Sequence, residues 1–556
     1  MAMNIARFVR HLCALNLGVL AFLFIIPSLE ALLLHQHVTL ASRLPSAILG
    51  LAYLCAFLTV AFLEHLKDRR ELVPLAVAVA ISVLMLALGA LVSQSITDAS
   101  WDGLAYHQPA IYELRAGWNP VLDQKDAGLF GNFLLANHYP KASWFCSATL
   151  FGVFGNIQAA KLTFFLAPTV FLSLMLLLKN TDLSPILRTA VALVLVLNPV
   201  AICQAWQFYV DGVLYYVLVL MMVAAIHYAR DRHPLDLVLM FLAALFAANV
   251  KFTGIIYAGI VVTWLVLDLR LAPGSVRRHY YQVLGGALGW VVGLLLTGWS
   301  PYLQHILKWQ HPFYPVYGEG RMDIVGFMMP KHFRGHTWLW RLWHAHAEFD
   351  LASASAVDVL KQLGLAGGAG MGSNSYDTIV LGFGRVFIFA VFLSLAASVI
   401  HLSRNFNKRM LLGLVTFCIF VFLNPAAWWP RYSPCLWALP VVLCMPTLLV
   451  GRRLLDRSLA MAALFLAGMT SYIYCGQSWW EQRDKGARED AEVVELMKQT
   501  TKGTPVEVAT ADFATYIYRL RREGYPLQWV SLKDLHCPAP ILRKTLRFCP
   551  PRLGQP

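Results

Sequence analysis

Charged residues are scarce in this chain of 556 residues. They make up 14% of it, whereas hydrophobic residues make up 58%, a balance too apolar for a soluble chain with two or three ordinary domains. Apolar runs of about 20 residues recur almost from end to end, and each is long enough to cross a hydrocarbon core of ~30 Å. The composition excludes a collagenous, disordered or cytosolic protein and predicts a polytopic membrane protein.

Several common catalytic motifs are also missing. The sequence has no GxxxxGK[ST] phosphate loop, no GxGxxG dinucleotide motif, no DxD acidic pair, no GxSxG elbow and no HExxH zinc motif. Cytosolic nucleotide chemistry is therefore not expected. An enzyme on the outer side of the membrane has to take its activated group from a lipid, because nucleotide donors are not supplied there.

Cysteine is too rare for a disulfide scaffold, with ten in the whole chain. Most of the cysteines lie in apolar runs, where a thiol behaves as a small hydrophobic group. Cys537 and Cys549 near the C-terminus are the candidate pair for a bridge.

The net charge of +14 indicates topology rather than a nucleic-acid partner. Lys and Arg concentrate in short connectors between apolar spans, as is typical of cytoplasmic loops. Arg7 and Arg10 precede a long apolar run without a small-residue cleavage site, which predicts a retained first helix with its N-terminus inside.

Counting apolar runs predicts about 13 transmembrane helices within residues 1–475, with large outer loops at 96–157 and 301–376. The predicted spans are 12–34, 44–64, 73–95, 158–178, 185–204, 211–229, 235–250, 254–270, 283–300, 377–402, 409–424, 434–450 and 458–475. Residues 476–556 are predicted to form a small α/β domain outside the membrane. It would begin with an amphipathic stretch at 490–498, followed by a strand at 506–509, a helix at 512–523 and a strand at 527–532.

The loop 96–157 carries Asp102 and His107 close to the membrane. A carboxylate and an imidazole five residues apart can supply a general base and a helper or metal ligand. In the structural alternative, which the spacing alone favours, Asp102 caps a helix over 103–116 and His107 lies on its polar face.

Three further charged residues interrupt apolar surroundings. Arg431 lies in the short outer loop 424–433, where its guanidinium suits a phosphate, although a snorkelling arginine in a tryptophan girdle gives the same pattern. Lys251 interrupts an apolar stretch in the same way. Asp211 begins a helix from the outside and either caps it or reaches into a shared cavity, with the cap favoured.

The loop 301–376 is rich in histidine but lacks a zinc-hydrolase pattern, so a structural surface loop is predicted. Its basic residues of interest are His305, Lys308, His311, His332, His336, His344 and His346.

Together these motifs resemble the GT-C superfamily of integral-membrane glycosyltransferases, which use polyprenyl-phosphate-linked sugars. Within it, the chain is most similar to bacterial relatives of protein mannosyltransferases and of the aminoarabinose transferase of lipid A. The resemblance covers roughly residues 75–475 and the α/β tail. It is carried, in the order of the family, by 102–107, 138–141, the helix start at Asp211, 251–254, 311–315, and Arg431 with Tyr432.

The resemblance implies an inverting transfer of a sugar from a polyprenyl-phosphate donor to an acceptor hydroxyl, on the periplasmic face of a bacterial inner membrane. The implied catalytic residues are Asp102 as base and His107 as a helper. Arg431 would bind the donor phosphate, with Lys141 and Lys251 as further contacts. The implied substrate contacts are Tyr106, His138, Tyr139, Asp211 and Tyr432.

Two departures from the family matter. Two extra spans precede the acidic loop, which leaves open an appendage role for the first two helices. Many family members pair two acids in this loop, whereas Asp102 has no adjacent acid. This departure counts against a bound divalent metal, which stays open, and no cofactor is firmly implied.

Other functions stay open as well. One is a transporter or flippase for a lipid or polysaccharide, which predicts charges near the bilayer midplane. Another is an oligosaccharide polymerase or ligase with a lipid diphosphate donor, for which Arg321, Arg334 and Arg341 are available. The sugar and the acceptor, whether lipid A, another glycan or a protein, are not specified by the sequence.

Overall fold

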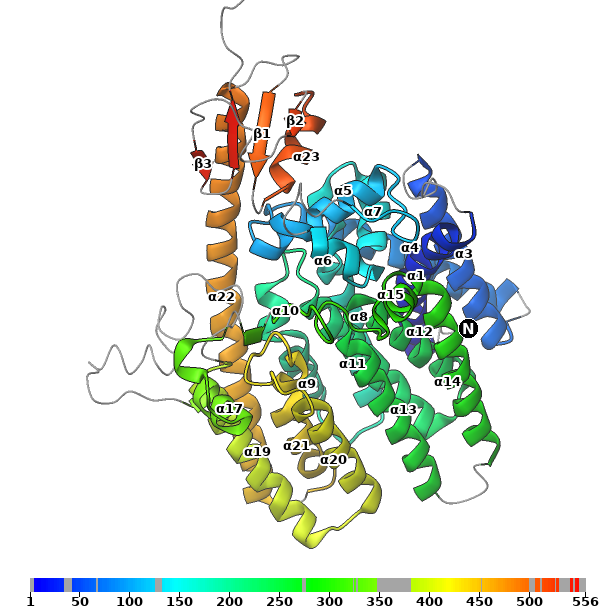
Figure 1. Cartoon of the computed structure of the whole chain (residues 1–556). Coiled ribbons are helices and arrows are strands. Elements are labelled where there is room, and N and C mark those ends of the chain that lie inside the picture. The colour runs from blue at the N-terminus through cyan, green and yellow to red at the C-terminus, as the bar shows by residue number, and fades with distance from the viewer. Residues whose placement is uncertain are drawn as a thin grey trace, which may run out of the picture.

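Helices dominate the computed structural model of this chain (Figure 1). The structure describes residues 5–34, 43–66, 69–125, 133–272, 277–323, 325–326, 329–347, 382–451, 453–499, 506–510, 513–525, 527–529, 541–543 and 546–549.

Nine helical segments in the described part of the chain are long and apolar enough to cross a membrane. They correspond to all or most of α1 (Ile5–Leu33), α3 (Pro45–Leu63), α4 (Arg69–Ser93), α8 (Thr163–Leu178), α11 (Asp211–Asp231), α13 (Thr253–Leu271), α14 (Arg277–Thr297), α19 (Arg385–Arg404) and α22 (Leu454–Gln499). The other four predicted spans coincide with shorter helices. These are α9 (Pro185–Val196), α12 (Pro234–Val250), α20 (Lys408–Phe422) and α21 (Leu439–Val450). A helical, multi-pass membrane protein is thus confirmed, whereas the count of 13 stays a prediction.

Short helices gather at one end of the bundle, where Figure 1 shows α5, α6 and α7 beneath the strands and α23. The short elements are η1 (Gly103–His107), α5 (Gln108–Arg115), α6 (Phe133–His138), α7 (Ala142–Phe154), η2 (Ile157–Ala160), α10 (Pro199–Cys203), η3 (Trp299–Leu303), α15 (Gln304–Trp309), η4 (Lys331–Phe333), α17 (Trp338–Ala347), η5 (Pro434–Ala438) and α23 (Thr515–Arg522). We call this end, which carries the loops predicted to lie outside, the outer end.

The first helix lies in the core of the bundle. Within α1 the amide of Asn16 donates a hydrogen bond to the Thr169 hydroxyl of α8 at 2.9 Å, and Phe24 packs edge-on against Phe246 of α12. Gly18 allows α3 to come close, because a Cβ at this position would lie 3.0 Å from that of Ala56. An appendage role is therefore wrong for α1, which is tied to the bundle by buried contacts.

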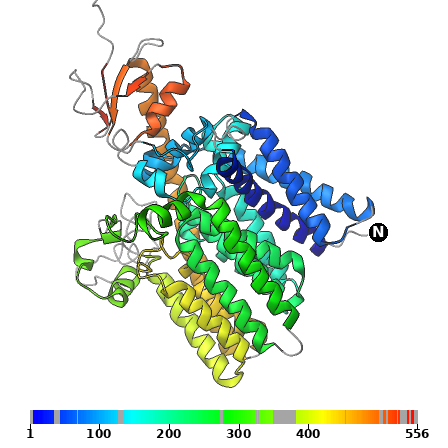
Figure 2. The same cartoon turned by 45° about the vertical axis from the view of Figure 1, so that its right-hand side comes forward.

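The long helix α22 links the bundle to the C-terminal sheet. Its 46 residues extend roughly 70 Å at 1.5 Å per residue, so the predicted span at 458–475 and the amphipathic stretch at 490–498 form one continuous helix. Figure 2 shows its far end beside the sheet, away from the bundle.

The tail contains four short strands and one helix. The strands β1 (Val506–Thr510), β2 (Leu527–Trp529), β3 (Ile541–Arg543) and β4 (Leu546–Cys549) form a sheet in the order β2-β1-β4-β3. β1 pairs with β2 in parallel and with β4 antiparallel, and β3 pairs with β4 antiparallel. β1, α23 and β2 fall where a strand, a helix and a strand were predicted. The predicted pairing of Cys537 with Cys549 stays a prediction, because Cys537 lies outside the described residues.

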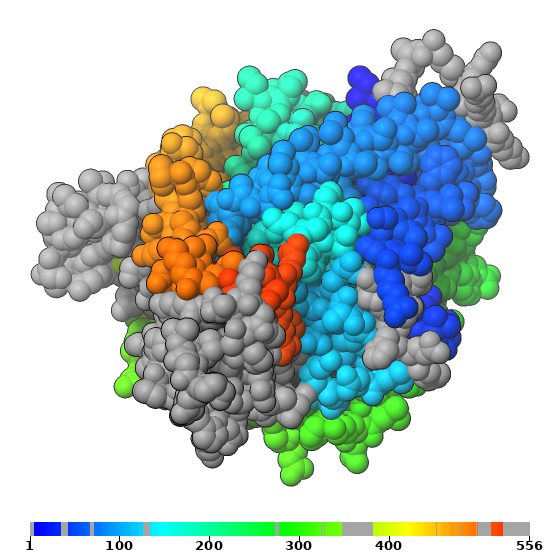
Figure 3. All heavy atoms as spheres, turned by 90° about the horizontal axis from the view of Figure 1, so that it is seen from above, coloured from blue at the N-terminus to red at the C-terminus, as the bar shows by residue number. Residues whose placement is uncertain are grey.

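Helix α23 packs directly on the segment that carries Asp102. The Thr515 hydroxyl donates to the carbonyl of Leu104 at 2.7 Å, and the ring of Tyr518 stacks on Tyr112 with 5.2 Å between centroids. Figure 3 shows the orange-red atoms of α23 against the cyan surface of the outer end. The tail therefore helps to hold the acidic loop in place.

Candidate functional site

Four charged side chains from four distant segments meet in one buried cluster. Arg431 donates from Nη2 to Asp102 and from Nε to Asp211 at 2.9 Å, and the ammonium of Lys251 binds the other carboxylate oxygen of Asp211. All four residues are between 0% and 8% exposed. Because charges so far from water need partners, the two carboxylates and two cations are placed to neutralise one another. We call Asp102, Asp211, Lys251 and Arg431 the charged cluster.

Asp102 reaches the charged cluster from the start of η1. It flanks a single π-helical turn over Gly103–His107, and its side chain makes no capping hydrogen bond there. A helix over this segment is thus present, but its cap is not the role of Asp102. The carboxylate is instead directed to Arg431.

Asp98 holds this segment against the loop before α11. Its carboxylate accepts hydrogen bonds from the backbone N–H of Ser100 at 2.8 Å and of Phe208 at 3.0 Å, and burial raises its pKa. This buried acid therefore fixes the approach of the chain to both Asp102 and Asp211.

Asp211 lies at the first position of α11, but the expected capping role is wrong. The residue that flanks the helix is Val210. The backbone N–H of Gly212, in the first turn of the helix, donates to Oε1 of Gln204 at 2.8 Å, and the amide of Gln204 donates to the Asp211 carboxylate at 3.0 Å. Since Gln204 supplies the capping oxygen, Asp211 is left to bind Lys251 and Arg431.

Lys251 owes its position to the break between α12 and α13. Its backbone is extended, with φ −153° and ψ 146°, so the chain leaves one helix and enters the next within a few residues. The ammonium lies 4.2 Å from the ring centre of Tyr432, next to Arg431 in the sequence. Arg431 itself lies 4.3 Å from the ring centre of Tyr209, and such aromatic faces stabilise cations.

An aromatic wall surrounds the charged cluster. His107 lies 4.3 Å from Tyr106, 6.1 Å from Tyr139 and 6.5 Å from Tyr209, measured between ring centres. Its Nδ1 accepts a hydrogen bond from the Trp144 indole at 2.7 Å. Burial lowers the pKa of His107 to about 4, so the neutral ring carries its proton on Nε2. Among the described residues this buried N–H has no hydrogen-bond partner, and it is available to a substrate oxygen.

His138 and His305 form a second buried group beside this wall. Nδ1 of His138 and Nε2 of His305 are 2.9 Å apart, and Nδ1 of His305 lies 3.2 Å from the carbonyl of Pro312. Burial lowers the pKa of His138 to about 3 and that of His305 to about 4. The predicted surface loop is therefore wrong for His305, which is buried, and equally for His346.

Acidification from pH 7.5 to pH 5 is expected to destabilise the outer end. The unfolded chain protonates both imidazoles near pH 6.5, whereas the folded pair stays neutral, so stability falls as the pH drops through that value. We expect a loss on the order of 1 kcal/mol for each imidazole. The check is the thermal unfolding midpoint against pH. His138→Gln should flatten the profile and the exposed control His332→Gln should not; an unchanged profile for His138→Gln would contradict the assignment.

Lys141 lies in the same wall but has different partners from Lys251. Its ammonium donates to the carbonyl oxygens of Asn137 at 3.0 Å and Tyr139 at 2.8 Å, and burial lowers its pKa to about 7. It is therefore only partly protonated near pH 7, and its role as a phosphate contact stays a prediction.

A divalent metal does not fit the charged cluster. Its carboxylate oxygens already bind the guanidinium and ammonium groups of Arg431 and Lys251, and a cation there would meet two positive charges. Across the described ranges no group of three or more His, Cys, Asp or Glu side chains is placed to hold a metal ion.

Sequence reasoning missed several residues of this site. Tyr209, Gln204 and Trp144 each contact a predicted site residue. Tyr209 and Gln204 lie within seven residues of Asp211, and a search for polar and aromatic neighbours would have found them. Comparison of the chain with models of protein families, with curated proteins and with solved structures gives no match.

Proposed function

We propose that this protein is an inverting glycosyltransferase of GT-C type, which moves a sugar from a polyprenyl-phosphate donor to an acceptor hydroxyl. The observation that carries the proposal is the charged cluster, because it joins a candidate base, Asp102, to a candidate phosphate ligand, Arg431, at one end of a membrane bundle. The proposed setting is the periplasmic face of a bacterial inner membrane, with the α/β tail on the same side.

The donor phosphate would replace the carboxylate of Asp102 as a hydrogen-bond partner of Arg431. The guanidinium binds oxygens of either group through the same N–H donors. A phosphate that takes the Nη2 donor of Arg431 frees Asp102 at the moment the donor arrives. Asp211 keeps its bonds to Nε of Arg431 and to Lys251, and so holds both cations in place.

The chemical step is then a single displacement. The acceptor oxygen attacks the anomeric carbon and its proton passes to the carboxylate of Asp102, while the bond from the anomeric carbon to the phosphate oxygen breaks. The bonding electrons leave with the phosphate, whose charge is stabilised by Arg431 and Lys251. Attack opposite the leaving group inverts the anomeric configuration.

The surrounding rings would orient the sugar. The free Nε2–H of His107 is a donor for a sugar hydroxyl, and Tyr106 and Tyr139 provide flat apolar faces beside it. Tyr432 lies against the ammonium of Lys251. Such fixed contacts contribute to catalysis by positioning the reacting atoms.

The other two functions find less support. A transporter site is expected near the midplane, whereas Asp211 and Lys251 lie at helix ends. A polymerase or ligase would use Arg321, Arg334 and Arg341, but the first two are exposed and Arg341 donates to the carbonyl of Phe333 at 3.0 Å.

The test is release of free polyprenyl phosphate by the purified protein in lipid nanodiscs. Polyprenyl-phosphate sugars of several kinds are supplied with envelope extracts containing lipid A, glycan and protein acceptors. We expect release that depends on both donor and acceptor. Transport of the intact donor across a vesicle membrane without release would instead support the transporter.

A further inference from the structure

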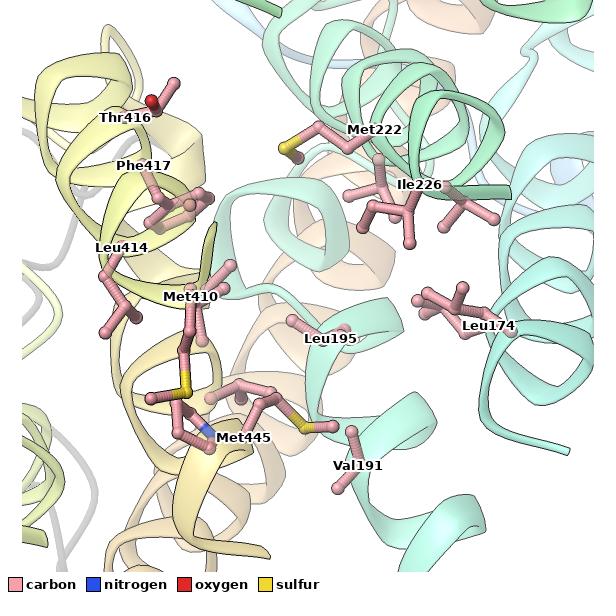
Figure 4. Close-up of a pocket in the computed structure, with 18 of the residues that line it drawn as sticks. Leu174, Val191, Leu195, Met222, Ile226, Met410, Leu414, Thr416, Phe417 and Met445 are labelled. Carbon is pink, nitrogen blue, oxygen red and sulfur yellow. The ribbon is translucent and has the colours of Figure 1, made fainter. Parts of the chain in front are cut away.

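A second feature lies inside the bundle, away from the charged cluster. It is an apolar cavity of about 380 Å³ bordered by α8, α9, α11, α13, α20 and α21. Figure 4 shows Met410, Leu414 and Phe417 of α20 on one side, with Met222 and Ile226 of α11 and Leu174 of α8 facing them across the space.

The cavity extends to the inner end of the bundle. Its lining on α11 runs from Val219 to Ile226, which is roughly 12 to 22 Å along the helix from Asp211 at 1.5 Å per residue. On α20 the lining runs from Phe420 to Met410, and from Ala438 through α21 to Val450, so it extends to the ends of these helices remote from Arg431. The cavity therefore reaches the end of the bundle opposite the charged cluster.

The lining selects a hydrocarbon chain. It consists almost wholly of Leu, Val, Ile, Met and Phe side chains, which offer nothing to water or to a polar headgroup. Two polar side chains border it, those of Thr416 and Trp264. The indole N–H of Trp264 is buried and has no hydrogen-bond partner among the described residues. This N–H can donate to an ester oxygen near the top of an acyl chain.

Cations gather where the lining helices end. Lys179 follows the lining residue Leu178, Arg230 donates to the carbonyl of Leu177 at 3.4 Å, and Lys408 and Arg453 lie two and three residues from the lining. All four cations are exposed. The neighbouring buried acids Asp268 and Asp456 already bind Arg409 and Arg404. Two exposed acids, Asp182 and Asp231, lie in the same connectors and leave the cations in excess.

We propose that this cavity holds one acyl chain of an anionic phospholipid from the inner leaflet, with its phosphate held by the cations at the mouth. A hydrocarbon pocket below a basic rim at the cytoplasmic side matches the two parts of such a lipid. The inference does not rest on the proposed function, since it uses none of the residues of the charged cluster.

The first test fills the cavity. Gly413 lines it, and a Cβ there would meet just the Trp264 indole at 3.9 Å, so Gly413→Leu extends into the space. The full chain is purified from membranes with equal phosphatidylglycerol and phosphatidylethanolamine, washed in detergent and analysed by native mass spectrometry. Wild type should retain about one phosphatidylglycerol per chain, and Gly413→Leu at least fivefold less. Val415→Leu, at an exposed position of the same helix, is the matched control and should retain it.

The second test changes charge without touching the core. Lys408→Gln combined with Arg453→Gln should lower the preference for phosphatidylglycerol over phosphatidylethanolamine at least fivefold, whereas the exposed control Arg278→Gln should not. Equal retention of both lipids by wild type, or unchanged retention in Gly413→Leu, would overturn the proposal. So would displacement of the bound phospholipid by added polyprenyl phosphate, because the cavity would then hold the donor chain.

Discussion

Asp102→Asn is expected to lower sugar transfer by roughly 10²-fold or more while the protein folds and inserts normally. The change is isosteric and removes the proton acceptor. The neutral amide also weakens the hydrogen bond from Nη2 of Arg431, whose Nε still binds Asp211. Donor affinity should therefore be kept or rise, and the loss should fall on turnover. The measurement is initial-rate release of polyprenyl phosphate over a range of donor concentrations.

The matched control for this variant is Glu113→Gln. Glu113 belongs to the same outer segment but binds Lys125 at 2.7 Å and the Tyr518 hydroxyl at 2.5 Å, outside the charged cluster. Its loss should change transfer less than about threefold, in line with a partly exposed ion pair. Normal transfer by Asp102→Asn would refute the base, and equal losses in both variants would indicate damage to the outer segment as a whole.

The sequence predicted the members of the charged cluster better than their arrangement. A charged residue in an apolar run is costly unless it has a partner, so Asp211, Lys251 and Arg431 could each be selected from local context. Their mutual pairing could not, because Arg431 lies 220 residues from Asp211 and 329 from Asp102. Such distances along the chain leave no local pattern.

The main error in the predicted roles concerns Asp211, and a break between helices explains it. Asp at a helix start is ordinarily a cap, and this rule favoured capping for Asp211. The structure assigns the capping oxygen to Gln204, which reaches back from the end of α10. Pro199 and the turn after Cys203 set up that reversal, and they occur in a stretch that hydropathy alone assigns to a single span. Apolar composition predicts where a chain crosses the membrane but not where a helix breaks within it.

Arg431→Lys is expected to weaken donor affinity and turnover together, each by about 10- to 100-fold. Lysine keeps the positive charge but lacks the planar, forked set of N–H donors of a guanidinium. One ammonium therefore cannot bind Asp102, Asp211 and a phosphate as the guanidinium does. The loss corresponds to one or two charge-assisted hydrogen bonds of ~1.5 kcal/mol or more each. Donor binding by an acceptor-free assay and single-turnover transfer measure the two effects separately.

A second arginine of the same chain provides the control for this change. Arg409 binds Asp268 through Nε at 2.8 Å and Nη2 at 2.6 Å, at the opposite end of α20. Arg409→Lys breaks the same kind of fork and should cost stability without altering donor affinity. If both variants lost transfer equally, the effect of Arg431 would come from packing of the bundle. A defect in donor binding confined to Arg431→Lys, with Asp102→Asn impaired in turnover alone, would separate the phosphate ligand from the base within one cluster.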